Sequence, residues 1–314
     1  MDDRDWLVER FESQRGQLRA VAYRMLGSLS DADDALQEAW LRVERADASS
    51  VENVGGWFTT IVARVCLNML RSRTARREDE LNLLRSRTSR TAGGDEEVEP
   101  RLPDPIVTLE QADDPEHDVL LADAVGLALL VVLDTLTPAE RLAFVLHDMF
   151  AVPFDDIASI LDRSPAAARQ LASRARRRVQ GAQTAPDVDV VRHRAVVDAF
   201  FAAARGGDFE ALLAVLDPDV VIRSDGGPGA VEVLRGAAVV AAQALAYREL
   251  APYARPALVN GVAGAIAVSD GRLAAVMAFT VRDGRVAAIH SLNDPERLAR
   301  MDIPHPASDT GAPG

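Results

Sequence analysis

Residues 154–179, FDDIASILDRSPAAARQLASRARRRV, predict a helix, a short turn and a second helix. The turn falls at Asp162 and Arg163. The second helix then begins with Ser164 as N-cap and Pro165 at the first helical position, residue types that favour a sharp helix start. Alanine, leucine and valine follow along one side of this helix, which predicts a packed inner face. The layout is that of a helix-turn-helix.

The outer face of this second helix is basic, although the chain as a whole is acidic. The sequence holds 35 Lys and Arg against 48 Asp and Glu, whereas residues 163–186 contain six arginines and no carboxylate. Arginine can pair bidentately with guanine and glutamine with adenine in the major groove, and further arginines bind phosphates. A solvated basic face on an ordinary bundle helix is the alternative. The candidate DNA contacts are Arg163, Ser164, Arg169, Gln170, Ser173, Arg174, Arg176 and Arg177.

The N-terminal part of the 314-residue chain is predicted to be helical throughout. Residues 5–80 carry apolar side chains at three- and four-residue spacing, the pattern of helices that bury one face. We expect one helix to begin after Ser30 as its N-cap, and another near Val54 after a turn at Asn53. These residues therefore predict an all-α domain.

An acidic, proline-containing stretch follows this domain, and a helical pattern resumes before the helix-turn-helix. Residues 81–118 are acidic and contain several prolines, which indicates a linker without regular structure. Helical signals resume over 119–183, where TPAE at 137–140 predicts a capping box with proline at the first helical position. The helix-turn-helix thus belongs to a second all-α domain.

A second basic patch ends the first helical domain. It follows GGWFTTIV, in which Trp57 and Phe58 lie beside polar residues. Aromatic and basic side chains along one helix suit unstacked bases and their backbone. The alternative is that both aromatics belong to the core, and only one of the two needs to be exposed for base contact. The candidate contacts are Asn53, Trp57, Thr60, Arg64, Arg71, Arg73, Arg76 and Arg77.

The helix predicted after Ser30 is acidic. Asp31, Asp33 and Asp34 stand at its start, where carboxylates complement the positive end of the helix dipole. A protein partner is the second interpretation, because carboxylates at this place would repel DNA. The sequence leaves both open.

Residues 188–303 have a different pattern of predicted secondary structure. Two amphipathic helical patterns precede strand-like runs, and two of these runs meet at Asp283-Gly284, the dipeptide that favours a two-residue hairpin turn. We expect an antiparallel sheet packed on helices. The chain is therefore predicted to be multidomain, with two all-α domains followed by an α+β domain.

The α+β domain offers few residues for catalysis. The candidates are Asp225, His290, Asn293 and Asp294. Turn chemistry explains Asp225, which lies in a glycine-rich loop, and a single histidine on a sheet is more often structural. The sequence shows no P-loop, dinucleotide fingerprint or metal-ligand spacing, so we expect neither an enzyme nor a cofactor or metal.

Compartment and membrane signals point to the cytoplasm. The N-terminus, MDDRDWLVERF, lacks the apolar region of a signal peptide. The apolar run Ala124–Leu133 is too short to span a bilayer. Cys66 is the single cysteine, which excludes an intrachain disulfide framework and suits a buried core position.

The helical segments together resemble a known family. AYRMLGSLSDADDALQEAWLRV, GWFTTIVARVCLNMLRSRTARRE and the stretch from LTPAERLAF to SRARRRV closely resemble bacterial sigma factors of the extracytoplasmic-function (ECF) group. The resemblance implies that residues 5–80 bind the −10 promoter element and core polymerase, and that 119–183 bind the −35 element. It also implies that the candidates around Asn53 open and contact the −10 region. The surface implied to dock on the β′ clamp helices comprises Asp34, Gln37, Glu38 and Trp40.

The C-terminal domain is similar to the SnoaL-like extension, of the NTF2-like cone fold, in the SigJ-type subgroup of these factors. LPDP in the linker and NDPERL at 293–298 match the subgroup, whereas SDGGPG lacks the basic residue of the corresponding DGGGK loop. In this subgroup the domain is thought to regulate the sigma module in cis. The implied regulatory residues are Asp225, Gly226, Gly227, Asp294, Pro295, Glu296, Arg297 and Leu298.

The resemblance also names partners. It implies core RNA polymerase, through the β′ clamp helices and the β flap, together with promoter DNA, and no membrane. An alternative reading makes the SnoaL-like domain a sensor of an unknown small molecule, or a cyclase- or isomerase-type enzyme, fused to a DNA-binding region. The sequence by itself leaves a ligand of this domain open.

Overall fold

The computed structural model describes residues 3–46, 51–88, 101–109, 126–181, 189–227, 231–269, 271–301 and 303. The chain forms two compact units, each described here by itself. Unit 1 comprises residues 1–97 and 132–183, and unit 2 comprises 98–131 and 184–314. Among the described residues, no helix has the length and apolar content needed to cross a membrane.

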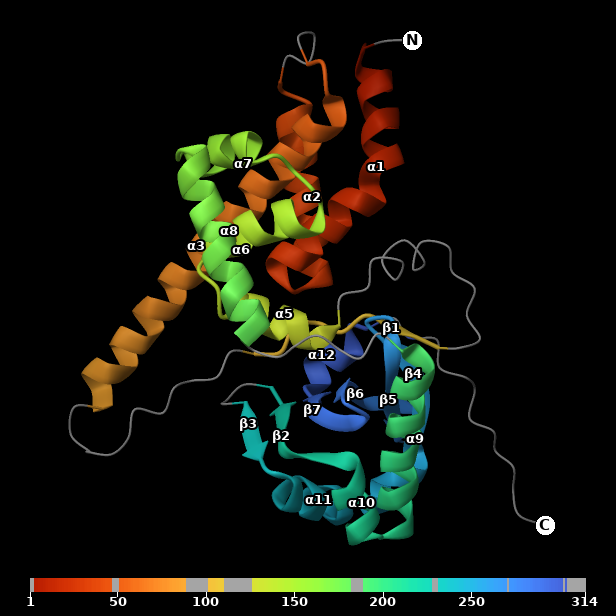
Figure 1. Cartoon of the computed structure of the whole chain (residues 1–314). Coiled ribbons are helices and arrows are strands. Elements are labelled where there is room, and N and C mark those ends of the chain that lie inside the picture. The colour runs from red at the N-terminus through yellow and green to blue at the C-terminus, as the bar shows by residue number, and fades with distance from the viewer. Residues whose placement is uncertain are drawn as a thin grey trace. The chain divides into compact units, whose positions relative to one another are not determined.

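Unit 1 is helical, as the sequence predicts (Figure 1). Phe11 is its aromatic centre: the ring lies 5.2 Å from both Trp40 and Phe58, so it joins the first three helices. Burial of such large rings dominates the energy of small helical cores. The elements are α1 (Asp3–Leu26), α2 (Leu29–Val43), α3 (Val54–Thr88), α6 (Pro138–Phe144), the π-helical turn η1 (Val145–Met149), α7 (Phe154–Leu161) and α8 (Pro165–Gly181).

The N-cap of α2 is Ser28, so the prediction of Ser30 is wrong. Gly27 adopts a left-handed φ of 72° and ends α1. The next residue, Ser28, is extended and accepts a hydrogen bond from the Asp31 backbone N–H. Ser30 therefore lies inside the first turn of α2. Because Gly27 in the left-handed conformation ends α1, the next helix can begin directly afterwards, two residues earlier than predicted.

Two other predicted helix starts are confirmed. Asn53 accepts a hydrogen bond from the Gly56 N–H at 3.0 Å, and α3 begins at the next residue. Thr137 and Glu140 form the predicted capping box, with Pro138 at the first helical position of α6. However, α3 continues through Thr88, beyond the predicted end of the domain at residue 80.

Unit 2 is α+β, as predicted. Its sheet has the strand order β1-β4-β5-β6-β7-β2-β3. All neighbouring strands are antiparallel except β2 and β7, which run parallel. The strands are β1 (Val107–Thr108), β2 (Leu216–Asp225), β3 (Glu232–Arg235), β4 (Ala254–Val259), β5 (Val262–Ser269), β6 (Arg272–Arg282) and β7 (Arg285–Leu292).

Helices cover one face of this sheet. Phe200 from a helix packs 5.4 Å from Phe279 of β6, and both belong to one buried cluster with Leu212 and Ile289. Asp283 and Gly284 both have positive φ, at 52° and 74°, which confirms the predicted hairpin turn between β6 and β7. The helices of this cluster are α9 (Val190–Gly206), α10 (Phe209–Val215) and α11 (Ala237–Ala246), and the unit also contains the 3-10 helix η2 (Arg248–Tyr253) and α12 (Pro295–Ala299).

Part of the predicted linker is built into unit 2. Val107 and Thr108 form strand β1, which pairs with the edge strand β4. Next to it, Ile106 exchanges two hydrogen bonds with Asn260, at 2.7 and 3.1 Å. The expectation of a linker without regular structure therefore fails for these residues. The prolines precede the strand and do not interrupt it. The edge of β4 supplies the backbone hydrogen-bonding partners for β1, which could not be predicted from the local sequence.

Candidate polymerase and DNA interfaces

One face of α2 is open to solvent. Asp34, Gln37 and Glu38 are exposed on it, and Leu41 continues the same stripe with 44% exposure. Leu41 was not predicted as a site residue; its signal in the sequence is an apolar residue that falls outside the buried stripe of its helix. Trp40 is half-buried because its ring packs on Phe11. Three of the four predicted polymerase contacts therefore form an accessible surface, and the fourth also supports the core.

The other carboxylates of α2 have partners within unit 1. Arg19 of α1 binds Asp33 with two hydrogen bonds of 2.7 and 2.9 Å. Arg73 of α3 pairs with Asp31 and also donates to the Leu26 carbonyl at the end of α1. These bonds tie the first three helices together. Asp31 and Asp33 thus have a structural role in addition to the helix-dipole role inferred from the sequence.

The start of α3 presents an aromatic residue beside polar ones. Trp57 is half-buried and packs 5.5 Å from Phe58, which is fully buried. Only one of the two aromatics is therefore accessible. Thr60 donates its hydroxyl to the Gly56 carbonyl of the same helix.

The arginines of α3 differ in their surroundings. Arg71 is exposed. Arg64 and Arg76 donate to the backbone carbonyls of Ser159 and Ser72, respectively. Arg73 is committed to α1 and α2 as described above, so it is less available to DNA than the sequence pattern suggests. The side chain of Arg77 lies outside the described residues.

The helix-turn-helix has the predicted form. Asp162 ends α7 in the left-handed conformation, with φ 55°, and Ser164 accepts a hydrogen bond from the Ala167 N–H at the start of α8. Ala168, Leu171 and Ala172 of α8 are buried. Arg163 and Ser164 are exposed in the turn. The exposed face of α8 comprises Arg169, Gln170, Ser173, Arg174 and Arg177, with Arg176 half-buried at its edge.

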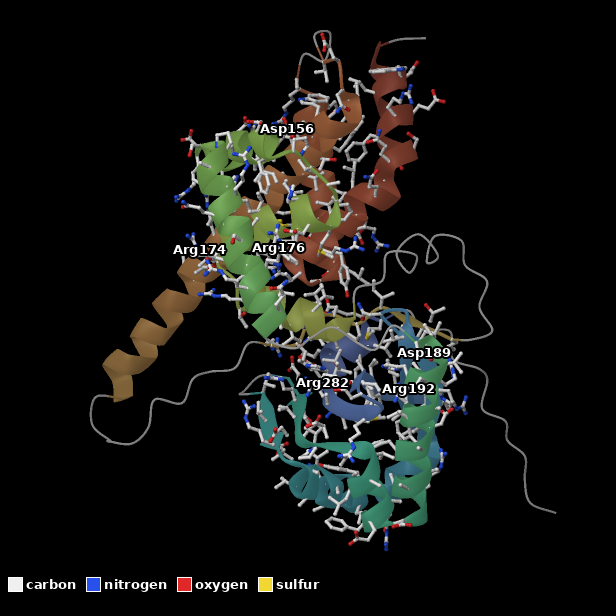
Figure 2. The ribbon with its side chains drawn as sticks, in the orientation of Figure 1. Asp156, Arg174, Arg176, Asp189, Arg192 and Arg282 are labelled. Carbon is white, nitrogen blue, oxygen red and sulfur yellow. The ribbon has the colours of Figure 1, made fainter. Side chains whose placement is uncertain are left out.

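Several arginines of α8 are held by neighbouring elements. Arg176 binds Asp148 of η1 at 2.7 Å, and Figure 2 shows Arg174 and Arg176 on the same helix. Arg169 stacks over the Phe154 ring, with its guanidinium carbon 5.4 Å from the ring centre. Phe154 is itself stacked on His147, 3.8 Å away. The start of α8 is thus bordered by a fixed stack of side chains.

Glu140 of α6 holds two further arginines. Its side chain is only 6% exposed and accepts hydrogen bonds from Arg174 at 3.0 Å and from Arg178 at 3.2 Å. Burial by itself raises the pKa of Glu140, but the hydrogen bonds from Arg174 and Thr137 and the charge of Arg178 outweigh it, and the pKa lies below its ordinary value. The capping role of Glu140 was predicted from the sequence, whereas its pairing with these arginines was not.

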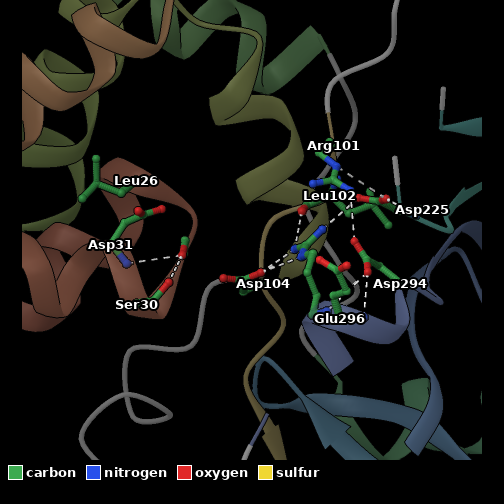
Figure 3. A network of polar contacts seen from close by, with 12 residues as sticks. Leu26, Ser30, Asp31, Arg101, Leu102, Asp104, Asp225, Asp294 and Glu296 are labelled. Atoms are coloured by element: carbon green, nitrogen blue, oxygen red, sulfur yellow. Dashed lines mark hydrogen bonds and ion pairs between the residues drawn. The ribbon is translucent and has the colours of Figure 1, made fainter. Parts of the chain in front are cut away.

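In unit 2 the structure brings the predicted regulatory residues together around Asp225 (Figure 3). Asp225 is 1% exposed and accepts a hydrogen bond from the Arg297 guanidinium at 2.8 Å. It also accepts hydrogen bonds from the backbone N–H groups of Leu102 at 3.0 Å and Gly227 at 3.3 Å. Turn chemistry therefore explains Asp225 only in part, because the acid also holds a segment 123 residues earlier in the chain.

The same cluster holds the LPDP segment from two further sides. Arg297 donates to the Leu102 carbonyl at 2.7 Å and pairs with Asp104. Arg101 binds Asp294 at 3.0 Å, and Asp294 caps α12 by accepting from the backbone of Glu296 and Arg297. The remaining predicted residues have simpler places: Gly226 and Pro295 are exposed, Gly227 adopts φ 113°, and Leu298 is buried.

His290 of β7 lines a small cavity. Its side chain is 2% exposed, and the cavity of about 10 Å³ is also lined by Leu127 and Thr280. Burial lowers the pKa of His290 to about 3, with the charge of Arg223 acting in the same direction. A cavity of this size admits a single water molecule. Within the described ranges, no three His, Cys, Asp or Glu side chains come together as a metal site would require.

Comparison with known proteins decides the family. The chain matches the models of Sigma-70 region 2 over residues 10–76 and Sigma-70, region 4 over residues 126–179. It is 38% identical over 308 residues to the ECF RNA polymerase sigma factor SigJ of Mycobacterium tuberculosis (strain H37Rv), covering 93% of both chains. The chain belongs to the ECF sigma factors. The probable ECF sigma factor SigI of the same organism is 32% identical over 304 residues, which cover 95% of this chain and 97% of that one.

A solved structure extends the likeness to the fold of this sigma factor. The crystal structure of Mycobacterium tuberculosis SigJ matches with a TM-score of 0.70 and 36% identity, covering 93% of this chain and 98% of that chain. The predicted fold class is therefore confirmed, with two helical sigma domains followed by an α+β domain. As an ECF sigma factor, the protein binds core RNA polymerase and directs promoter-specific transcription initiation.

Proposed function

We propose that this sigma factor recognises promoters through two surfaces of unit 1. The exposed side chains of α8 enter the −35 major groove, and the start of α3 opens the −10 region. The accessible residues support this assignment: Gln170 and Arg177 are exposed on α8, Trp57 is half-buried in the first turn of α3, and Asn53, just before α3, is exposed. A helix face in the major groove and an aromatic residue at an unstacked base are the two elements that this task requires.

The exposed face of α2 is the proposed contact with the β′ clamp helices. Asp34, Gln37 and Glu38 supply polar contacts, and Leu41 supplies an apolar one at the end of the stripe. A polar surface with one exposed apolar anchor is typical of a protein–protein interface. The helix-turn-helix domain has the β flap as its proposed partner.

Unit 2 is proposed to regulate the sigma module in cis. The chain passes from unit 1 into unit 2 at residues 98–131 and then returns to α6. The covalent connection between the two helical sigma domains is therefore the segment that Asp225 and Arg297 hold in unit 2. Release of this segment would lengthen the free connection and change the span between the −10 and −35 surfaces.

We propose no catalytic step for unit 2. The cavity beside His290 is small, at about 10 Å³. The buried carboxylates Asp225 and Asp294 are committed to Arg101, Arg297 and the backbone of the linker. These contacts support a regulatory domain rather than an enzymatic one.

In vitro transcription with purified core RNA polymerase tests the proposal. Full-length protein should yield promoter-specific transcripts, and Arg297→Ala should change their yield at a promoter of fixed spacing. Arg282→Ala, which removes a partly exposed ion pair with Asp217 in the same unit, is the matched control. A chain ending near Thr184 is a poorer test, because it would expose the buried side chains of Leu102 and Ile106.

The outcomes separate the parts of the proposal. Equal yields for wild type, Arg297→Ala and Arg282→Ala would contradict regulation through the linker but leave promoter recognition intact. No promoter-specific transcript from any form, across a library of promoter fragments, would contradict the assignment of the two DNA surfaces.

A further inference from the structure

The arginines of α8 are not equivalent, and their positions on the helix divide them into two classes. With 3.6 residues per turn, Gln170, Ser173 and Arg177 form a stripe along the middle of the exposed face. Arg174 and Arg178 lie on one border of this stripe, and Arg169 and Arg176 lie on the other. The residues on the two borders contact neighbouring elements of unit 1. The middle stripe lies on the side of the helix opposite its buried face.

Both borders are occupied by side-chain contacts. Glu140 accepts from Arg174 and Arg178 on one side. Asp148 and the Phe154 ring hold Arg176 and Arg169 on the other side. The guanidinium groups that flank the stripe are therefore turned toward the protein. The Arg177 Nε, by contrast, donates to the Ser173 carbonyl of its own helix, at a distance of 3.5 Å.

From this arrangement we propose that Glu140 is a positioning residue for −35 recognition: it keeps Arg174 and Arg178 away from the bases, so that Gln170, Ser173 and Arg177 determine the sequence preference. The proposal rests on the −35 role assigned to α8 above. It differs from the sequence prediction, which placed Arg174 among the residues that contact DNA on the same footing as the others.

The chemistry of Glu140 suits this role. A carboxylate that is almost fully buried needs charged partners, and its partners here come from the recognition helix itself. Each arginine keeps about half of its side chain exposed, at 49% and 54%. The positive charges therefore still raise the potential near the DNA backbone, while their hydrogen-bonding edges point to Glu140. Such charges add affinity without sequence information.

The substitution Glu140→Gln isolates the role. Glutamine at the third helical position preserves a capping box with Thr137, so the start of α6 is kept. The substitution removes the charge and one of the two acceptor oxygens that hold the arginines. Once released, they are free to bind phosphates or bases, which should raise affinity and blur the base preference. The slope of log affinity against log salt should steepen by about one for each arginine that reaches a phosphate.

The experiment measures base preference at each −35 position with full-length protein, core polymerase and a promoter library randomised there. Gln170→Ala or Arg177→Ala should lower the preference at one position by about 5-fold or more. Arg174→Ala should lower overall binding while changing the preference by less than about 2-fold at every position. Glu140→Gln should relax the preference and steepen the salt slope, and adding Arg174→Ala and Arg178→Ala to it should restore the wild-type preference.

Arg15→Ala is the matched control, because it removes one arginine from an exposed ion pair on α1. A loss of preference in Arg174→Ala as large as that in Gln170→Ala would overturn the inference. So would a Glu140→Gln protein with wild-type preference and salt slope. If Glu140→Gln does not fold, the comparison of Arg174→Ala with Gln170→Ala decides. A wild-type protein without any −35 preference would overturn the proposed function and this inference with it.

Discussion

The Arg297 guanidinium lies 2.8 Å from the buried carboxylate of Asp225, although 72 residues separate the two in the chain. Arg297 also donates to the Leu102 carbonyl, and Asp225 accepts from the Leu102 N–H. The pair thus holds both backbone groups of one linker residue. This pair is thus one of the connections between the linker and the α+β unit, together with the pairing of β1 with β4.

Arg297→Ala should release the linker around Leu102 and Asp104, the two linker residues that Arg297 contacts. The substitution leaves Asp225 buried without its closest cation, a change that costs about 3 kcal/mol for a buried pair. Hydrogen exchange of a peptide covering these residues should accelerate by about 100-fold, the equivalent of that energy. Arg282→Ala breaks a partly exposed pair and should cost less than about 1 kcal/mol. Equal protection of the peptide in both variants would show that Arg297 does not hold the linker.

Unit 2 should lose stability in acid because of His290. Its folded-state pKa, about 3, lies below the ordinary value near 6.5, so the unfolded chain binds the proton more readily. The contribution is fully present above pH 6.5 and is lost as pH falls toward 3, by about 1.4 kcal/mol per pH unit and on the order of 5 kcal/mol in all. Urea unfolding of unit 2 between pH 7 and 5 measures this slope.

His290→Gln, which does not titrate, should flatten that part of the pH profile. His147→Gln, a change in unit 1, serves as the control and should leave the profile of unit 2 unchanged. Arg223, which lies opposite His290 on the neighbouring strand, is present in both proteins, so the comparison isolates the imidazole. An unchanged slope in His290→Gln would assign the acid sensitivity to other groups.

Cys66 should be inert to alkylation in the folded protein. Burial raises the pKa of its thiol to about 12, an effect that the charges of Arg141 and Arg73 only partly offset. Because the thiolate is the reactive species, iodoacetamide should label Cys66 only when unit 1 unfolds. Mass spectrometry after timed labelling in increasing urea measures this. Rapid labelling without denaturant would show that the α3 core opens far more readily than its packing indicates.

The sequence predicted most of unit 1 because its signals are local. The capping box at Thr137, the turn at Asp162 and the cap at Ser164 each depend on a few neighbouring residues. The error at Ser30 arose from two competing serines, and only the left-handed Gly27 decides between them. Local patterns therefore identify elements well and their first residues less well.

Contacts between distant segments could not be predicted in the same way. The residues near Val107 do not predict a strand, because the strand with which they pair is β4, about 150 residues later in the chain. The pairing of Glu140 with Arg174 likewise joins two helices whose approach is set by tertiary packing. Arg73, predicted to contact DNA, was found on Asp31 for the same reason. Residue type shows which groups can form an ion pair, and the fold selects the partner.

Substitution by alanine should destabilise unit 2 at Gly264 and stabilise it at Gly206. A Cβ added at Gly264 of β5 would lie 2.5 Å from the Met277 carbonyl oxygen and 2.7 Å from a Val259 methyl group. Gly264→Ala must therefore push two strands apart, which costs about 1–3 kcal/mol by overpacking. At Gly206, in the last turn of α9, an added Cβ meets no atom within 4 Å. Gly206→Ala should stabilise unit 2 by about 0.5–1 kcal/mol, because alanine loses less entropy in a helix.

Thermal unfolding of the two variants, monitored through the amide exchange of unit 2, measures both effects against wild type. The pair distinguishes a steric cause from a general response to alanine. If Gly264→Ala were neutral, the sheet would have to accommodate the added methyl group without losing contacts between β5 and its neighbours β4 and β6. The close strand spacing around residue 264 would then not limit the size of the side chain at this position. If both variants were destabilised equally, the change would reflect the loss of glycine itself and not the contact with Met277.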